Sequence, residues 1–271
     1  MEFLSFQKAK AVWALGRSQV MNDFLLFQCV FEAEKNEKML LRLTGSTLYR
    51  VKLNGEFLGY GPARGPKGVF RIDEMAFCAG EGQNVLEIEI SGANVNSYYY
   101  MDHPSFLQAE LFRNGNIVAW TGKHFKAYDL TCERIQKVPR FSFQRMFSEA
   151  YRVSPHRHNL KELDLEVFPS FRYLARTVPF PDYKIDTSYK AIRTFRRSRQ
   201  KDLAEVNAHI QDPRPDFKCY PYNDPDYCNT YTDLKQLVCD EQGSIVSTLY
   251  SGKINNTGFI RLKVNCKVPG K

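Results

Sequence analysis

Apolar and polar residues alternate along most of the first 130 positions of this chain. In the segment YRVKL (residues 49–53) every second side chain is apolar, and NVLEIEISG (84–92) has one apolar and one acidic face. A period of two is typical of β-strands with one buried face. Further strands are expected at residues 22–34, 37–44, 106–112, 116–120 and 123–130.

Two turn signals divide these strands. Asn54-Gly55 and Asn114-Gly115 each separate a pair of strands, and such pairs adopt the positive φ angles of tight hairpins. Glycine and proline recur through residues 59–68, which predicts a rigid loop without regular pairing. Because no long amphipathic helix intervenes, the pattern predicts an all-β fold, either an antiparallel β-sandwich or a jelly roll.

The pattern changes along the chain and predicts three regions. Residues 1–153 read as the sandwich, and residues 154–215 carry prolines and bulky aromatic residues without periodicity, as in an extended connection. Strand-like alternation returns within residues 216–271, which we expect to be part of a second β-domain that the chain does not complete. An incomplete domain would leave the apolar strand 258–264 unpaired, and a homodimer could form along that edge.

Composition narrows the class of protein. A content of 43% hydrophobic and 14% aromatic residues is typical of globular proteins. No window approaches a membrane span, and the first residues lack the apolar core of a signal peptide. We therefore expect no membrane partner and a cytoplasmic location, or an exported protein if a leader has been removed. The seven cysteines include no C-x-x-C pair, which suits reduced thiols.

The net charge of +8 raises the question of nucleic-acid binding. The densest basic run, KAIRTFRRSRQK (190–201), has neither a known nucleic-acid module nor aromatic residues placed for stacking on bases. We interpret it as a solvated loop or helix face, or as a surface for an acidic partner domain. Nucleic acid is not an expected partner.

The sequence shows no catalytic constellation. Nucleophile-elbow and phosphate-loop motifs are absent, and His156 and His158 lack a third metal ligand at suitable spacing. The segment NDPDY (223–227) lacks the remaining ligands of a calcium loop. We therefore expect no catalytic residue, no metal and no cofactor, and we place Asp73 and Glu87 on turns or solvent faces.

The best candidate for a binding surface is SYYYMDHP (97–104). Sugars stack an apolar face on an aromatic ring while polar side chains hydrogen-bond their hydroxyl groups, and this segment supplies both kinds of group. An alternative stays open, in which the tyrosines seal the domain against another domain or subunit. The candidate carbohydrate-binding residues are Tyr98, Tyr99, Tyr100, Asp102 and His103, with Arg64, Lys67 and Trp120 as lesser candidates.

Three segments also carry a family resemblance. LYRVKLNGEFLGYGPARG, RIDEMAF and GEGQNVLEIEI resemble, in this order, the amino-terminal β-domain of bacterial α-L-rhamnosidases of glycoside hydrolase family 78. Residues 140–152 and 256–264 are similar to later segments of that family. The resemblance implies a galactose-binding-like sandwich in a parent enzyme that hydrolyses terminal α-L-rhamnosyl linkages by inversion.

In that family, hydrolysis belongs to a later α/α barrel, and this sequence has no series of long amphipathic helices. The resemblance thus implies a non-catalytic scaffold whose partners are the catalytic barrel and a rhamnosylated glycan. Two other interpretations remain. One is a self-standing carbohydrate-binding or structural β-sandwich protein, and the other is a complete hydrolase that would turn over an aryl rhamnoside.

Overall fold

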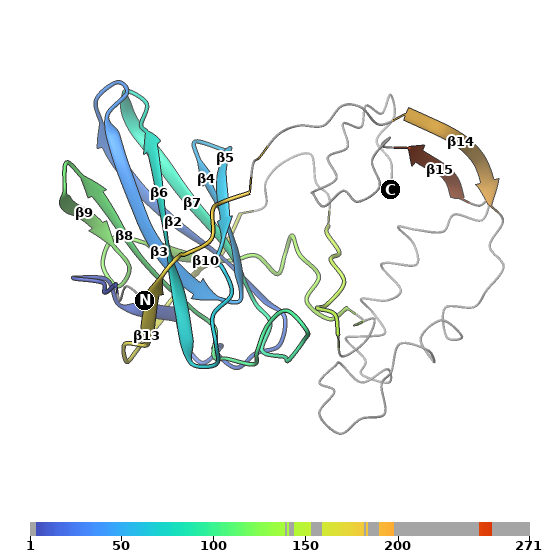
Figure 1. The fold of residues 1–271 in the computed structure, drawn as a ribbon, viewed down its shortest axis with the longest axis horizontal. Coiled ribbons are helices and arrows are strands. Elements are labelled where there is room, and N and C mark those ends of the chain that lie inside the picture. Colours follow the sequence, from blue (N-terminus) through green and yellow to red (C-terminus); the bar gives the residue numbers. More distant parts are fainter. Residues whose placement is uncertain are drawn as a thin grey trace.

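A computed structural model of the chain describes residues 4–138, 140, 144–152, 159–181, 183, 190–197 and 244–250. Every regular element in these residues is a strand, so the predicted all-β class is confirmed (Figure 1). The strands are β1 (Ala11–Ala14), β2 (Asp23–Ala33), β3 (Lys38–Ser46), β4 (Leu48–Leu53), β5 (Glu56–Gly61), β6 (Val69–Cys78), β7 (Gly82–Gly92), β8 (Phe106–Arg113), β9 (Asn116–Trp120), β10 (Lys126–Asp129), β11 (Glu162–Leu163), β12 (Leu165–Phe168), β13 (Arg172–Ala175), β14 (Lys190–Arg197) and β15 (Ser244–Tyr250).

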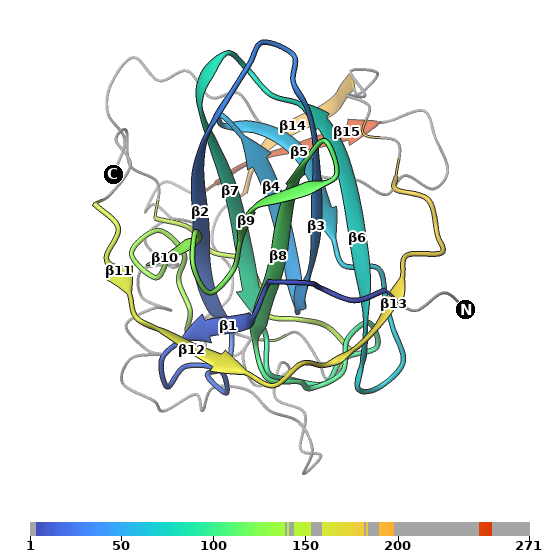
Figure 2. The ribbon, with the colours of Figure 1, turned by 90° about the vertical axis from the view of Figure 1, so that its left-hand side faces the viewer.

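Two sheets lie face to face as a β-sandwich (Figures 1 and 2). The seven-stranded sheet has the order β12-β1-β8-β3-β6-β13, with β9 on β8, and the six-stranded sheet has the order β11-β10-β2-β7-β4-β5. Within the sandwich, β13 pairs with β6 in parallel, and the other described pairs are antiparallel. The first part of the basic run is strand β14, paired with β15, and so is neither loop nor helix.

The core lies between the two sheets and is formed by the apolar side chains that alternate with polar ones along the strands. On β2 the buried side chains Leu25, Phe27 and Cys29 stand opposite Ile90, Ile88 and Leu86 of β7. Burial raises the pKa of the Cys29 thiol to about 11, so this cysteine serves as a small hydrophobic residue.

Both predicted hairpins are present. The φ angles of Asn54 and Gly55 are 51° and 83°, and those of Asn114 and Gly115 are 49° and 79°. Strand β5 runs further than the glycine pattern predicts, because Gly59 and Gly61 still pair with β4. The irregular loop begins at Pro62 and ends at β6.

The segment predicted to be an extended connection contributes strands to the sandwich. β11 pairs with β10, β12 with β1, and β13 with β6. The described part of the connection is therefore fixed by backbone hydrogen bonds. The division into domains stays a prediction, and residues 201–210, 223–227 and 258–264 lie outside the described residues.

One end of the sandwich collects the loops that carry most of the candidate site residues. Because β5 and β7 both pair antiparallel with β4, they end on the same side. The chain then crosses to the other sheet, through residues 62–68 into β6 and through residues 93–105 into β8. Strand β10 is antiparallel to β2, so the chain also leaves β10 at this end.

Candidate functional site

The candidate tyrosines lie on a tight turn in the loop between β7 and β8. The hydroxyl oxygen of Ser97 accepts hydrogen bonds from the backbone N–H groups of Tyr99 and Tyr100, at 3.1 and 3.0 Å. The Ser97 N–H donates to the Tyr100 carbonyl at 2.8 Å. Tyr98 and Tyr99 are 66% and 40% exposed, whereas Tyr100 is partly buried, and this burial raises its pKa.

Buried polar contacts hold the two ends of this loop. The side-chain amide of Asn94 donates to the Ser105 hydroxyl at 2.8 Å and to the Val20 carbonyl at 2.9 Å. Asn94 is 2% exposed, so these bonds are shielded from water. The Ser105 N–H also donates to the Ser18 carbonyl at 2.8 Å. The loop is therefore joined to the segment that connects β1 to β2.

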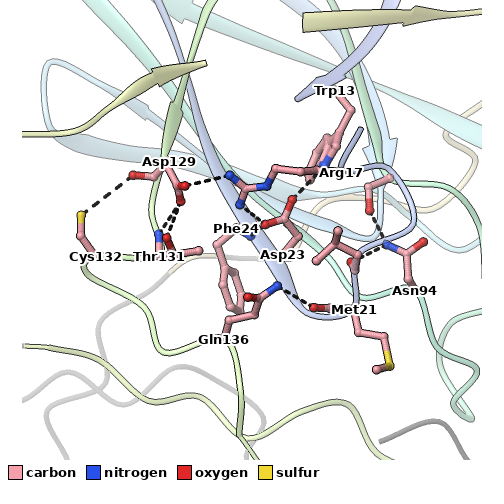
Figure 3. A network of polar contacts seen from close by, with 12 residues as sticks. Trp13, Arg17, Met21, Asp23, Phe24, Asn94, Asp129, Thr131, Cys132 and Gln136 are labelled. Carbon is pink, nitrogen blue, oxygen red and sulfur yellow. Dashed lines mark hydrogen bonds and ion pairs between the residues drawn. The ribbon is translucent and has the colours of Figure 1, made fainter. Parts of the chain in front are cut away.

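Figure 3 shows that Asn94 lies beside a second network at the start of β2. The carboxylate of Asp23, which is fully buried, accepts a hydrogen bond from the Trp13 indole at 3.0 Å and forms an ion pair with Arg17. Arg17 also reaches Asp129 at 2.8 Å. These contacts tie β1, β2 and β10 together beneath the loop.

Arg140, in the segment after β10, also supports the loop. This residue is 1% exposed, and its guanidinium donates to the carbonyl of Asn96 at 2.7 Å and to the carbonyl of Arg145 at 2.9 Å. The Gln144 amide donates to the Tyr98 hydroxyl at 3.0 Å. Sequence reasoning missed this role, since Arg140 carried only family resemblance and its contact with Asn96 joins residues distant in the chain.

Two arginine side chains contact the ring of Tyr99. The Arg64 guanidinium carbon is 4.7 Å from the centroid of the Tyr99 ring, and that of Arg145 is 5.9 Å away. Both distances are within the range of cation–π contacts. His103 contacts the Phe70 ring at 5.0 Å. Burial and the charge of Lys67 lower the pKa of His103 against the opposing effect of Asp102, so its imidazole is neutral at pH 7.

The structure brings together seven of the eight predicted site residues, Trp120 being the exception. Arg64 meets Tyr99 directly, and Asp102 and His103 continue the same loop. Trp120 lies elsewhere, on β9, where its ring contacts Lys8 at 4.8 Å, Lys123 at 5.1 Å and His124 at 4.2 Å. Trp120 is therefore part of a separate surface.

A buried carboxylate lies next to Gly61, the residue before the loop that carries Arg64. Asp73 is fully buried and accepts hydrogen bonds from the Tyr49 hydroxyl at 2.6 Å and from Arg176 at 3.0 Å. Burial raises the pKa of Asp73, while these two donors oppose the rise. The prediction that Asp73 and Glu87 lie on turns or solvent faces is wrong, because Asp73 is 0% and Glu87 is 7% exposed.

Neither a metal site nor a membrane span is found in the described part of the chain. Its histidine, cysteine, aspartate and glutamate side chains form no group of three that could hold an ion. No helix there has the length and hydrophobicity needed to cross a membrane. His156 and His158 lie outside the described residues.

Comparison with solved structures identifies the fold. The family 78 rhamnosidase of Bacillus sp. GL1 matches with a TM-score of 0.60 and 19% identity, over 75% of this chain and 24% of that one. Two further structures are more distant. An α-L-rhamnosidase from Aspergillus terreus has a TM-score of 0.40 and 11% identity, over 60% of this chain and 21% of that one. A Pleurotus ostreatus lectin in complex with GalNAc has a TM-score of 0.38 and 12% identity, over 56% of this chain and 45% of that one. No family model and no curated protein sequence matches the chain.

The chain thus spans about a quarter of the Bacillus enzyme, and the scores below 0.5 do not establish a common fold. An identity of 19% supports similarity of fold and does not by itself transfer an activity. The resemblance predicted from the sequence is confirmed at this level: the chain has the β-sandwich fold of part of a glycoside hydrolase family 78 rhamnosidase.

Proposed function

We propose that this chain is a non-catalytic β-sandwich region of an α-L-rhamnosidase-like glycoside hydrolase, and that its tyrosine loop contacts the carbohydrate of a rhamnosylated substrate. The observation that carries this proposal is the exposed Tyr99 ring, which Arg64 and Arg145 contact from two other segments. The loop of Tyr99 also contains Asp102 and His103. The similarity in fold to the Bacillus enzyme supports the assignment to a larger hydrolase.

The loop has the chemistry of a sugar-contacting surface. An aromatic ring stacks on the apolar C–H face of a sugar, and Tyr98 and Tyr99 are both exposed enough for this contact. A neutral imidazole at His103 both donates and accepts hydrogen bonds, which suits hydroxyl groups. Because Asn94 and Arg140 already hold the loop, binding would require little further ordering.

In this proposal, a barrel elsewhere in the parent protein carries out the hydrolysis. An inverting glycosidase needs two carboxyl groups about 6.5–9.5 Å apart with a water molecule between them. The buried Asp23 and Asp73 are instead neutralised by Arg17 and Arg176. We therefore expect no hydrolysis of an aryl rhamnoside by the purified chain.

The competing role for the same loop is an interface with the catalytic barrel, which the exposure of Met101 (45%) and Tyr98 (66%) favours. A cytoplasmic location and a homodimer stay predictions.

Titration of L-rhamnose and a rhamnosylated oligosaccharide into the purified chain, followed by amide chemical shifts, tests the proposal. We expect saturable binding that is lost in Tyr99→Ala. Trp120→Ala is the matched control and should bind normally, because its ring lies on a separate surface. A folded sample that shows no shift changes up to millimolar ligand would refute sugar contact and leave the loop as an interface.

A further inference from the structure

Three cations converge on the tyrosine loop from two other segments. Arg64 and Lys67 come from the loop between β5 and β6, and Arg145 comes from the segment after β10. Arg64 and Arg145 both contact the Tyr99 ring, and the charges of Lys67 and Arg64 act on His103 and Tyr100. We name these three residues the cationic rim.

The rim carries charge that no carboxylate within the structure neutralises. All three side chains are exposed, and none forms an ion pair with any residue that the structure describes. Other arginines of the sandwich differ in this respect: Arg17, Arg42 and Arg50 each pair with an aspartate or glutamate. The nearest acidic residue in the loop sequence is Asp102, so positive charge exceeds negative charge there.

The geometry suits a carboxylate. A guanidinium that stacks on an aromatic ring leaves its N–H edges open, and these edges bind a carboxylate through two parallel hydrogen bonds. Arg64 and Arg145, with guanidinium carbons 4.7 and 5.9 Å from the ring centroid, place two anion-binding groups next to Tyr99, whose side chain is 40% exposed. A neutral sugar would use the ring and leave both cations unpaired.

We propose, on the basis of the proposed function, that this site selects an acidic carbohydrate, in which carboxylate groups of uronosyl residues pair with Arg64 and Arg145 while a sugar ring stacks on Tyr99. Lys67 adds long-range attraction. A nucleic acid is less favoured, because the three cations gather at one loop, whereas single-stranded nucleic acids are bound by charged grooves that follow many phosphates.

The test compares two ligands that differ only in charge. One is an oligosaccharide of alternating rhamnose and galacturonic acid, and the other is the same oligosaccharide after reduction of its carboxyl groups to alcohols. We expect the acidic form to bind about tenfold more tightly at low salt, as two exposed charge pairs would provide. The difference should shrink to about threefold or less near 0.5 M NaCl, where screening is strong.

Substitutions then test which side chains cause the preference for the acidic oligosaccharide. Arg64→Gln combined with Arg145→Gln should bring the acidic form down to the affinity of the neutral form. Lys35→Gln combined with Lys38→Gln removes the same charge from exposed positions where the chain crosses from β2 to β3, at the other end of the sandwich, and should preserve the preference. Lys67→Gln alone should weaken the preference about twofold. Since all these side chains are exposed, we expect unchanged thermal unfolding.

The outcomes separate the two proposals. Equal binding of both oligosaccharides would overturn the selection of acidic sugars and leave the proposed function standing. Binding of neither would overturn both. An oligothymidylate of equal charge that binds as tightly as the acidic oligosaccharide would also overturn the inference, because the rim would then be a general polyanion site.

Discussion

At the scale of single residues, Asp23 and Asp73 show how the sandwich keeps charge in its interior. Both are fully buried, and each meets an arginine, Arg17 or Arg176, together with an aromatic donor. A buried carboxylate is stable only when such partners replace its water. The loops next to the candidate site therefore depend on these ion pairs.

Arg176→Gln should destabilise the protein by about 3 kcal/mol, because the ionised Asp73 would remain buried without its counter-charge. Urea unfolding at pH 7 measures the effect. Arg172→Gln, four residues earlier and exposed, is the matched control and should change the free energy of unfolding by less than about 0.5 kcal/mol. Equal losses in the two variants would show that the ion pair contributes nothing specific.

Gly61 is required by the same network. A Cβ atom at this position would lie 1.9 Å from the Asp73 carboxylate and 2.7 Å from the Tyr49 hydroxyl oxygen. Gly61→Ala should therefore destabilise the protein by about 2 kcal/mol or more. At Gly80 the nearest atom would be 3.4 Å away, so Gly80→Ala should be nearly neutral. A thermal unfolding midpoint that is equally high in both variants would contradict this account.

At the scale of elements, the outer face of the six-stranded sheet is held by charges across neighbouring strands. Glu89 on β7 pairs with Lys52 at 2.6 Å and with Arg50 at 3.2 Å, both on β4. Burial opposes the ionisation of Glu89, but these two cations outweigh it and leave its pKa below the usual value. This carboxylate therefore links the two strands through its charged form.

The lowered pKa of Glu89 determines how the stability of the fold depends on pH. A carboxyl group with a lower pKa in the folded state stabilises the fold above its unfolded pKa of about 4.3, and the stabilisation is lost as the pH falls through the folded value. Glu89→Gln should reduce stability by about 1 kcal/mol at pH 7, and the difference from the native protein should vanish in acid. Urea titrations between pH 7 and 2.5 measure it. Glu56→Gln, at an exposed hairpin position, should show no such convergence.

At the scale of the whole molecule, alternation predicts the long strands well and the short or interrupted ones poorly. Strands β2, β4 and β7 were predictable because one face is apolar over most of its length. Strand β1 has only the four residues AVWA, all buried, so no alternation marks it. On β6, the buried Asp73 interrupts the apolar face, and the arginine that permits it is on the chain after β13.

The candidate site could also be predicted from the sequence only in part. The tyrosines and Arg64 could be found from composition, because each stands in a loop rich in functional or turn residues. Arg140 and Arg145 could not be found, since their contacts with Asn96 and Tyr99 join residues that are distant in the chain. Trp120 has the right chemistry for a sugar but stands on another strand. Side-chain type is readable in the sequence, whereas convergence depends on topology.

A fragment of residues 1–183 should fold by itself, because it holds both sheets together with Tyr183, whose ring packs against Phe57 and Tyr60 of β5. All strands of its two sheets end by Ala175, and its main core cluster is drawn from positions between Val12 and Ala127. Both tryptophans, Trp13 and Trp120, belong to it, so fluorescence reports its unfolding. We expect one cooperative urea transition, within about 1 kcal/mol of the matching transition in the full chain. A fragment without such a transition would show that residues beyond 183 complete the sandwich, and the predicted division into domains would then be wrong.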